Sequence, residues 1–487
     1  MADDLISRVA VLNAALGSDV PLVRIPPTVQ VSRRAWQALA VASFGTVLAG
    51  FNSTATNIAL TDIEEGLGAT KTAVGWGVAG YFIATAAFLP LGGRLADRLG
   101  RKRVFQFGIF LFAVSSVLSW AAPDVWTLNA ARVLQAMAGA AVLPSSLALV
   151  LPLFPESRRS GAVGLWSAAG PLAAGIAPFA SAAILSTAGW RVVYLLTAPV
   201  AVVMWFVARA TLDELPTEDS AERLDILGAA AGTVGIAAIV ATIMQGRVWG
   251  TIPAIAVGFV GISALAVFVW SSLRHKAPVL NLHLLSRRGV VVANGANFLI
   301  SVTSLSIWLV WPKFLLGVYE FSTLRTGLAM TVGPVVAGTS TVIFSRLSDK
   351  IGQTLLIRFG ASLQVCAVTW QFLRLDEQQH YWADFAPGMI LFGLGWGMST
   401  PLINSYALEW IEEQFWGEAN GLFNTVRYAA AAVGTGAVFA LLTVDAGVES
   451  LVAYDRILGF FLVITIAAFA CLWIPTGRPP VTGAAPK

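Results

Sequence analysis

The sequence predicts an all-α protein that crosses a membrane many times. Only 12% of the 487 residues are charged, whereas 57% are hydrophobic. Soluble domains carry about 25% charged residues, so this chain has too few to cover a water-exposed surface of its size. Its apolar residues also gather into runs of about 20, the length of helix that crosses a bilayer core of about 30 Å. These observations predict a polytopic helical membrane protein.

Fourteen apolar segments are long enough to span the bilayer as helices. The predicted spans are residues 36–58, 73–94, 104–121, 126–150, 160–185, 191–209, 224–244, 251–272, 290–312, 326–345, 354–373, 384–407, 417–442 and 455–474. Lys and Arg are concentrated in the loops and tails that share a side with the N-terminus. Because such residues are retained on the cytoplasmic side, both termini are expected to face the cytoplasm.

A dense cationic stretch follows the second span, and a reduced copy of it follows the tenth. The first copy runs from Gly93 to Arg103 and the second from Ser345 to Gln353. Both hold Arg, Leu, Asp, a cation and Gly in the same register. A motif duplicated at matching positions indicates two structural halves. With the seventh and eighth spans set aside as an insertion, the chain divides into six spans plus six.

This division predicts the domain organisation of the chain. The predicted parts are a cytoplasmic N-terminal segment (1–35), a six-helix bundle (36–210), a loop with two inserted spans and an interfacial segment (211–289), a second six-helix bundle (290–474) and a cytoplasmic tail (475–487). We expect the two bundles to rock against each other around a site near the bilayer midplane.

The duplicated motif has features that membrane topology alone does not require. Glycines permit tight turns, and the acid can pair with a cation or cap a helix. Charges at an interface between bundles resist partial separation, because it leaves a desolvated charge without a partner. We therefore predict a gating role, the alternative being that the cations only set topology. The predicted gating residues are Gly93, Arg94, Asp97, Arg98, Gly100, Arg101, Lys102, Arg346, Asp349 and Lys350.

Few ionisable residues fall inside the spans. Arg132 in the fourth span and Arg427 in the thirteenth are expected to face a wet cavity, a proton path or a partner, because a guanidinium in the bilayer is costly. Gln135 lies one turn from Arg132 and is expected to share its role. Asp62, just beyond the first span, is the nearest candidate for a proton-carrying carboxylate. The alternatives are snorkelling for Arg132 and bonds to the carbonyls of an interrupted helix for Arg427.

Several of these motifs resemble those of the major facilitator superfamily. The stretch Gly93–Arg103 resembles its signature loop, and Arg132 to Ala136 resembles its arginine motif of the fourth span. The antiporter motif of the fifth span is resembled by Gly170, Pro171 and Gly175. The fourteen-span layout and the segment from Asn420 to Arg427 resemble the drug:proton antiporter branch. The resemblance covers about residues 36–475.

The resemblance implies a function. Such a carrier would export small amphipathic organic compounds, by antiport against protons, as a monomer in a lipid bilayer, with a bacterial inner membrane implied. It implies neither a cofactor nor enzyme activity. The sequence itself has no nucleotide-binding loop of the Gly-x4-Gly-Lys-Ser/Thr kind and no spacing of His or Cys that suggests a metal site. Its net charge of +4 resides in loops and does not indicate nucleic-acid binding.

One position departs from the pattern of that branch. The first-span motif usually begins with Asp, but here Asn52 stands in its place. An amide neither gains nor loses a proton in this pH range. Two alternatives therefore stay open: a facilitator or metabolite exporter without proton coupling, and a membrane sensor that does not transport. Two deep arginines without a deep carboxylate also favour an anionic or zwitterionic cargo.

Overall fold

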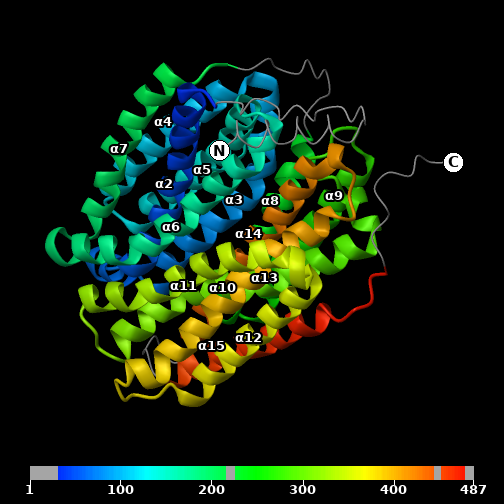
Figure 1. Cartoon of the computed structure of the whole chain (residues 1–487). Helices are drawn as coiled ribbons and strands as arrows, with labels where there is room; N and C mark the ends of the chain where they lie inside the picture. The colour runs from blue at the N-terminus through cyan, green and yellow to red at the C-terminus, as the bar shows by residue number, and fades with distance from the viewer. Residues whose placement is uncertain (1–30, 215–224, 444–450, 478–487) are drawn as a thin grey trace, which may run out of the picture.

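The computed structural model describes residues 31–214, 225–443 and 451–477. Within these ranges the chain folds into fourteen α-helices and contains no strand. Figure 1 shows them as α2 (Arg33–Gly66), α3 (Lys71–Leu99), α4 (Arg101–Trp120), α5 (Val125–Val150), α6 (Glu156–Ala188), α7 (Trp190–Thr211), α8 (Ile226–Trp249), α9 (Thr251–Arg274), α10 (Arg288–Gly317), α11 (Thr323–Ile351), α12 (Gln353–Arg374), α13 (Ala386–Leu408), α14 (Trp416–Leu442) and α15 (Leu451–Cys471). Each predicted span corresponds to one of them.

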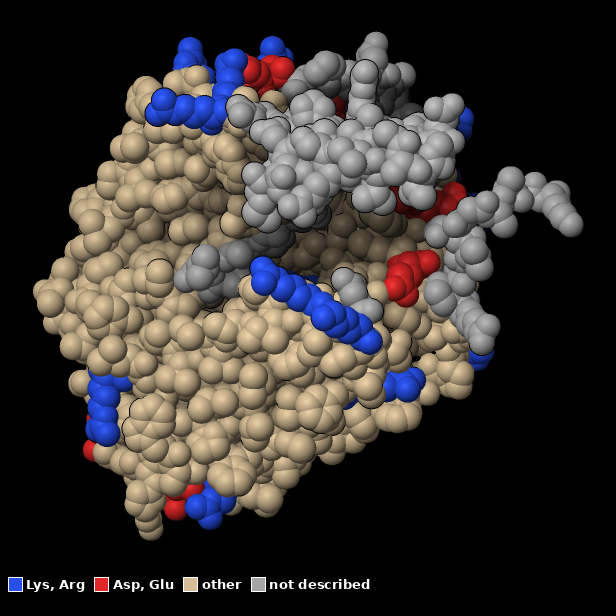
Figure 2. All heavy atoms as spheres, in the orientation of Figure 1, with Lys and Arg blue, Asp and Glu red and all other residues tan. Residues whose placement is uncertain are grey.

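The helices have the length and composition of membrane spans. In the described part of the chain, thirteen are long and apolar enough to cross a bilayer, and α6 contributes the shorter apolar stretch Ala173–Ala188. Figure 2 shows that most of the visible surface is free of Lys, Arg, Asp and Glu. Large apolar side chains lie exposed on this outside, among them Ile252 and Phe259 of α9. An apolar exterior of this extent fits contact with lipid, so the prediction of an all-α polytopic membrane protein is confirmed.

The helices form two groups that meet along a central junction. In the first group α3 and α4 pack on α5 and α2 packs on α6, whereas in the second α12 and α11 pack on α13 and α10 packs on α14 and α15. Figure 1 shows the first group, coloured from blue to green, above the second, coloured from yellow-green to red. The groups meet where α6 packs on α11, α3 on α14 and α2 on α10. The inserted pair α8 and α9 covers one side of this junction, because α8 packs on both α3 and α14.

The two copies of the duplicated motif have nearly the same backbone conformation at the glycine that joins their helices. Gly100 joins α3 to α4 with φ 103° and ψ 130°, and Gly352 joins α11 to α12 with φ 96° and ψ 132°. Such a conformation favours glycine, since a side chain is strained at positive φ. The stretch expected to be a loop is thus the last turn of one helix, a single glycine and the first turn of the next. The prediction from hydropathy ended each span too early here, because hydropathy does not detect a helix that continues through polar residues.

The two ends of the molecule differ. We call the end at which α3 meets α4 and α11 meets α12 the motif end, and the end at which α2 and α10 finish the opposite end. At the opposite end the halves touch closely. A Cβ added to Gly75 of α3 would lie 2.6 Å from the Phe439 ring of α14, and one added to Gly327 of α11 would lie 2.6 Å from the carbonyl oxygen of Pro178 in α6. Small residues thus let the halves close this end.

Candidate functional site

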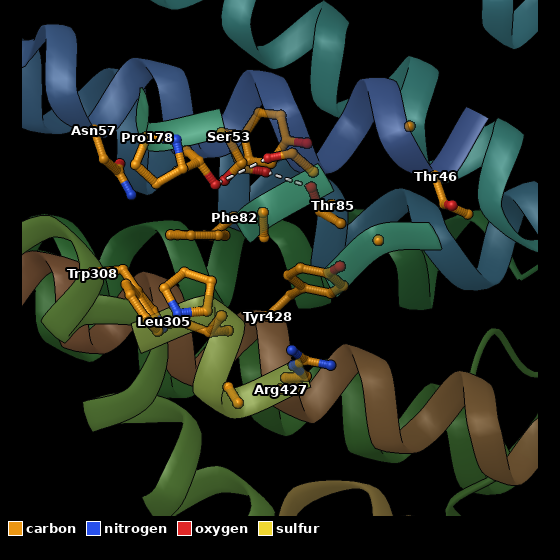
Figure 3. A pocket seen from close by; sticks show the side chains of 18 of the residues that line it. Thr46, Ser53, Asn57, Phe82, Thr85, Pro178, Leu305, Trp308, Arg427 and Tyr428 are labelled. Atoms are coloured by element: carbon orange, nitrogen blue, oxygen red, sulfur yellow. Dashed lines mark hydrogen bonds between the residues drawn. The ribbon is translucent and has the colours of Figure 1, made fainter. Parts of the chain in front are cut away.

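A cavity of about 400 Å³ lies between the two halves. Its volume falls within the range of ~300–1,000 Å³ that is typical of sites for drug-sized molecules. Helices α2, α3, α5 and α6 supply one side, and α10, α11, α13 and α14 the other. Figure 3 shows side chains of both halves pointing into this space. The lining is Thr46, Gly50, Ser53, Thr54, Asn57, Ile58, Tyr81, Phe82, Thr85, Gly139, Leu143, Gly170, Ala174, Pro178, Leu305, Trp308, Pro312, Met330, Pro334, Ala337, Gly338, Trp396, Arg427 and Tyr428.

The lining combines aromatic rings with a few uncharged polar groups. Phe82 of α3 stacks on Tyr428 of α14 with ring centroids 6.3 Å apart, so this pair links the halves beside the cavity. Trp308 of α10 and Trp396 of α13 complete an aromatic wall in the second half. Hydroxyl and amide groups come mainly from α2. Such a surface suits flat, amphipathic molecules, because rings supply apolar area while the polar groups orient the ligand.

Arg427 is the one charged residue in this lining. It projects from α14 toward the cavity (Figure 3). Its guanidinium carbon lies 5.8 Å from the centroid of the Trp396 ring, a cation–π distance. Within the described residues Arg427 makes neither an ion pair nor a hydrogen bond. The structure thus places Arg427, for which the sequence predicts a cavity role, in the lining of the cavity, and the role itself stays a prediction.

Arg132 lies behind the cavity wall rather than in it. It is 3% exposed, and its guanidinium carbon stands 4.6 Å from the centroid of the Tyr81 ring, which itself lines the cavity. Arg132 donates hydrogen bonds to the side-chain oxygen of Asn52 and, at 2.5 Å, to that of Gln135. Gln135 in turn donates to the hydroxyl of Ser116 at 3.0 Å. The structure therefore brings together Asn52, Arg132 and Gln135 in a buried network inside the first half.

The chemistry of this network follows from the amide of Asn52. Asn52 is 1% exposed and lies where an acid would neutralise Arg132. An amide oxygen satisfies a guanidinium N–H but carries no charge, so the positive charge of Arg132 remains uncompensated by the groups that it contacts. The side-chain nitrogen of Asn52 has no partner among the described residues. The network can hold a charge in place, but its amides cannot carry a proton.

Asp62 belongs neither to the lining of the cavity nor to the network of Asn52, Arg132 and Gln135. It lies near the end of α2 toward the opposite end of the molecule, is half-buried, and does not line the cavity.

Glu64, two residues further along α2, forms an ion pair that the sequence analysis did not predict. The Nζ of Lys313 in α10 lies 2.8 Å from a carboxylate oxygen of Glu64 in α2, with the two side chains only 1% and 11% exposed. The sequence did contain a signal for this pair: a single Lys follows Trp311 and Pro312 within an otherwise apolar helix.

This ion pair joins the two halves at the opposite end. Taking two opposite charges out of water is costly, and separating them leaves each one buried without its partner. The pair therefore stabilises contact between α2 and α10 for as long as both side chains stay buried. Together with the close approaches at Gly75 and Gly327, it closes the opposite end in this structure.

The antiporter-type motif lies where α6 meets the second half. Gly170 lines the cavity. A Cβ added to Gly175 would lie 3.8 Å from Val335 and 3.9 Å from Pro334 of α11, so this glycine faces the other half. Pro171 belongs to the helical part of α6, but its side chain lies outside the described residues. The motif thus occupies a face of α6 that packs against α11.

The first copy of the gating motif is held within its own half. Arg101 donates to Asp97 at 3.2 Å and to the carbonyl oxygen of Ala148 in α5 at 3.2 Å. Lys102 donates to the carbonyl oxygens of Arg209 and Leu212 at 3.1 and 2.5 Å. The gating role predicts contacts with the second half, but among the described residues neither Arg101 nor Lys102 forms a hydrogen bond or ion pair with it.

A carboxylate from the end of the first half completes this arrangement. Glu214 accepts hydrogen bonds from the backbone N–H groups of Lys102 and Arg103, at 3.0 and 3.2 Å. These N–H groups belong to the first turn of α4, where a helix lacks internal acceptors and favours negative charge. The sequence analysis placed Glu214 in the loop that begins the segment 211–289 but did not connect it to the motif. Gly93, Arg94 and Arg98 lie in the last turns of α3 on the same end.

The second copy of the motif is described only in part. Arg346 and Lys350 lie in the last turns of α11, and the side chain of Asp349 lies outside the described residues. Gln353, the first residue of α12, donates a hydrogen bond to Glu409 beyond the end of α13. Burial raises the pKa of the Glu409 carboxyl above its usual value. Over the ranges that are described, no cluster of three or more His, Cys, Asp or Glu residues could hold a metal ion.

Comparison with known proteins identifies the family. The model of the Major Facilitator Superfamily matches residues 42–435 and 292–487. The puromycin resistance protein pur8 of Streptomyces alboniger is 30% identical over 433 residues, which cover 87% of this chain and 84% of that protein. The methylenomycin A resistance protein of Streptomyces coelicolor is 27% identical, with 90% of this chain and 93% of that protein covered.

Solved structures share the fold. The crystal structure of a D-xylose-proton symporter superposes with a TM-score of 0.68 at 15% identity, over 91% of this chain and 98% of that one. At this identity the likeness establishes the arrangement of helices alone. Combined with the family match, it means that the chain belongs to the major facilitator superfamily and is a multi-pass membrane transporter rather than an enzyme.

Proposed function

We propose that this transporter exports small amphipathic organic compounds from the cytoplasm by proton antiport and alternating access. The central cavity is the observation that carries the proposal: both halves line it, and inter-half contacts close it at the opposite end. Relatives whose names denote antibiotic resistance support a drug-like cargo. In the proposed orientation both termini and the motif end face the cytoplasm of a bacterial inner membrane, and the protein acts as a monomer.

The proposed moving parts follow the two groups of helices. Residues 36–210 and 290–474 form the bundles, 211–289 form the inserted segment, and 1–35 and 475–487 are cytoplasmic. Cargo enters the cavity from the motif end. For release, the bundles separate at the opposite end, which requires the ion pair between Glu64 and Lys313 to break and α6 to part from α11. The charged motif at Gly93–Arg103 then contacts the second bundle and closes the motif end.

Proton coupling needs a carboxylate that can take up a proton from one side of the membrane. Neither the lining of the cavity nor the Arg132 network provides one among the described residues. The candidates are Asp62 and Glu64 near the opposite end of α2, and Glu64 is already engaged by a buried cation. This position favours a coupling in which opening of the opposite end breaks the pair with Lys313 and exposes the Glu64 carboxylate to the outer side.

The same absence of a cavity carboxylate supports a second candidate, a facilitator without proton coupling. A flux experiment separates the two. Everted membrane vesicles with an acidic lumen are exposed to aromatic antibiotics and dyes of positive, neutral and negative charge. Proton antiport predicts uptake that stops when a protonophore removes the gradient. Uptake that continues unchanged favours the facilitator. Absence of flux for every compound, with the protein present at normal abundance, contradicts both and favours a sensor.

A further inference from the structure

We infer that the central cavity selects flat aromatic anions and that Arg427 provides the counter-charge for the cargo. This inference rests on the proposed function, because it names the class of molecule that the same cavity takes. Three observations carry it: the charges in the lining, the partners of Arg427, and the uncompensated charge of Arg132 behind the wall.

The charges in the lining are the first observation. Arg427 is the only ionised group among the residues that line the cavity in the described chain. A positively charged cargo would therefore lose its hydration without gaining an opposite charge, and a buried charge without a partner is costly. An anion entering the same space meets a guanidinium. The cavity thus discriminates by the sign of the cargo's charge.

The partners of Arg427 are the second observation. Its described contact is the Trp396 ring, with the guanidinium carbon 5.8 Å from the ring centroid. The N–H donors of the guanidinium have no acceptor among the described residues, so they remain available to a ligand. A planar guanidinium binds a carboxylate through two parallel hydrogen bonds, a geometry that a point cation does not reproduce. Arg427 is accordingly suited to a carboxylate or a similar flat oxyanion.

Arg132 is the third observation. Its contacts are the amide oxygens of Asn52 and Gln135, which leave its positive charge in place. The ring of Tyr81, whose centroid is 4.6 Å from the guanidinium carbon, also lines the cavity, so this charge lies directly behind the wall. In surroundings of low dielectric such a charge acts over several ångströms. Arg132 therefore adds to the positive potential that Arg427 creates and further disfavours a cationic cargo.

The rest of the wall accounts for the preference for flat rings. Trp308 and Trp396 line the second half, and Phe82 and Tyr428 stack at 6.3 Å across the junction. Stacked and edge-to-face contacts between rings are favourable beyond the area that they bury. An aromatic ring lying on Trp396 would place its acidic substituent beside Arg427. The inferred ligand is thus an aromatic ring system with one carboxylate.

Three probes of the same shape test this inference: 2-naphthoate, 2-naphthamide and 2-naphthylmethylammonium. Their binding to the full chain in phosphatidylcholine nanodiscs is measured by equilibrium dialysis, with empty nanodiscs subtracted. We expect 2-naphthoate to bind about tenfold or more tightly than the amide, since a hydrogen bond to a charged group contributes about 1.5–3 kcal/mol and 1.4 kcal/mol is tenfold. The ammonium probe should bind most weakly.

Variants assign the preference to one residue. Arg427→Gln should bring 2-naphthoate to the affinity of the amide, whereas Arg427→Lys should keep part of the preference. Arg247→Gln is the matched control, because Arg247 is an exposed arginine at the end of α8, away from the cavity. It should bind all three probes as the wild type does.

Several results would overturn the inference. They are equal or tighter binding of the ammonium probe by the wild type, an unchanged preference in Arg427→Gln, and no saturable binding of any probe. Loss of 2-naphthoate binding in phosphatidylglycerol nanodiscs would instead assign the site to an anionic lipid headgroup. Flux is measured separately: binding in the expected order without flux contradicts the proposed function and leaves the inference standing, whereas flux without the order contradicts the inference alone.

Discussion

Arg132 and Arg427 lie in opposite halves of the same membrane protein, and their surroundings differ. Arg132 is 3% exposed and bonded to the amides of Asn52 and Gln135. Arg427 lines the cavity, and its described contact is the ring of Trp396. Both guanidiniums are costly in a bilayer, but the first half gives one nitrogen of its arginine two amide acceptors, while the arginine of the second half has no acceptor among the described residues and faces the cavity. Under the proposed function, Arg132 orders its bundle and Arg427 meets the cargo.

Removing each arginine in turn gives the largest expected contrast. Arg132→Met leaves the buried oxygens of Asn52 and Gln135 without donors, so it should lower the free energy of unfolding by about 3 kcal/mol. Arg427→Met removes a charge with no hydrogen bonds in the described structure, so stability should change little. Thermal unfolding of both variants in the same detergent checks this. Equal losses of stability would break the contrast between the two arginines.

The duplicated glycines offer a second contrast between the halves. Gly100→Ala and Gly352→Ala place a side chain at positive φ, which costs about 1–3 kcal/mol each. The first should cost more, because its Cβ would lie 2.8 Å from the carboxylate of Glu214, whereas nothing lies within 4 Å at Gly352. Thermal unfolding ranks the two variants. A larger loss for Gly352→Ala would show that the contacts of Glu214 do not strengthen the first copy.

Asn52→Asp tests whether the charge of Arg132 reaches the cavity. A carboxylate at this position would neutralise Arg132 without touching the lining. The preference for 2-naphthoate over the ammonium probe should fall by less than about tenfold, or about 1.4 kcal/mol, and by less than in Arg427→Gln. Equilibrium dialysis of both variants measures this. An unchanged preference would confine charge selection to Arg427.

The smallest expected effect concerns pH and the start of the helix that carries Arg132. Asp124 caps α5, and its pKa is lowered because it accepts hydrogen bonds from the backbone N–H and hydroxyl of Thr127 and from the N–H of Trp126. A lowered pKa contributes stability above the unfolded value, and this stability disappears as the pH falls through the folded value. Asp124→Asn should therefore lose less stability than the wild type between pH 6 and pH 3. Parallel losses in unfolding scans would contradict this.

Much of the fold could be predicted because it depends on the local composition of the sequence. Apolar length alone located all fourteen helices, and the duplicated motif indicated two halves. The boundaries were wrong where helices continue through polar residues, as α2 does past Asp62 to Gly66. In the same way, the motif at Gly93–Arg103 was expected as a loop but is helical up to Leu99.

The site was predicted only in part, for a physical reason. Arg132 and Gln135 share one helix face, so their proximity follows from helical spacing. Glu64 and Lys313 belong to helices of different halves, and no periodicity brings them together. Likewise, the sequence does not reveal that Arg132 is buried beside Tyr81 and outside the lining of the cavity, because such burial depends on how several helices pack.

The central claim is that the two halves alternate in opening around the cavity. Spin labels on two pairs of exposed positions test it in a variant that lacks Cys366 and Cys471. One pair lies at the motif end, at Leu153 and Leu355, and the other at the opposite end, at Ala188 and Leu324.

Double electron–electron resonance on both label pairs in nanodiscs, across pH and with or without bound aromatic anion, is the most direct measurement. Alternation predicts that the distance at the motif end shortens in those conditions in which the distance at the opposite end lengthens. Two distances that stay fixed under every condition, or that lengthen together, would contradict the account.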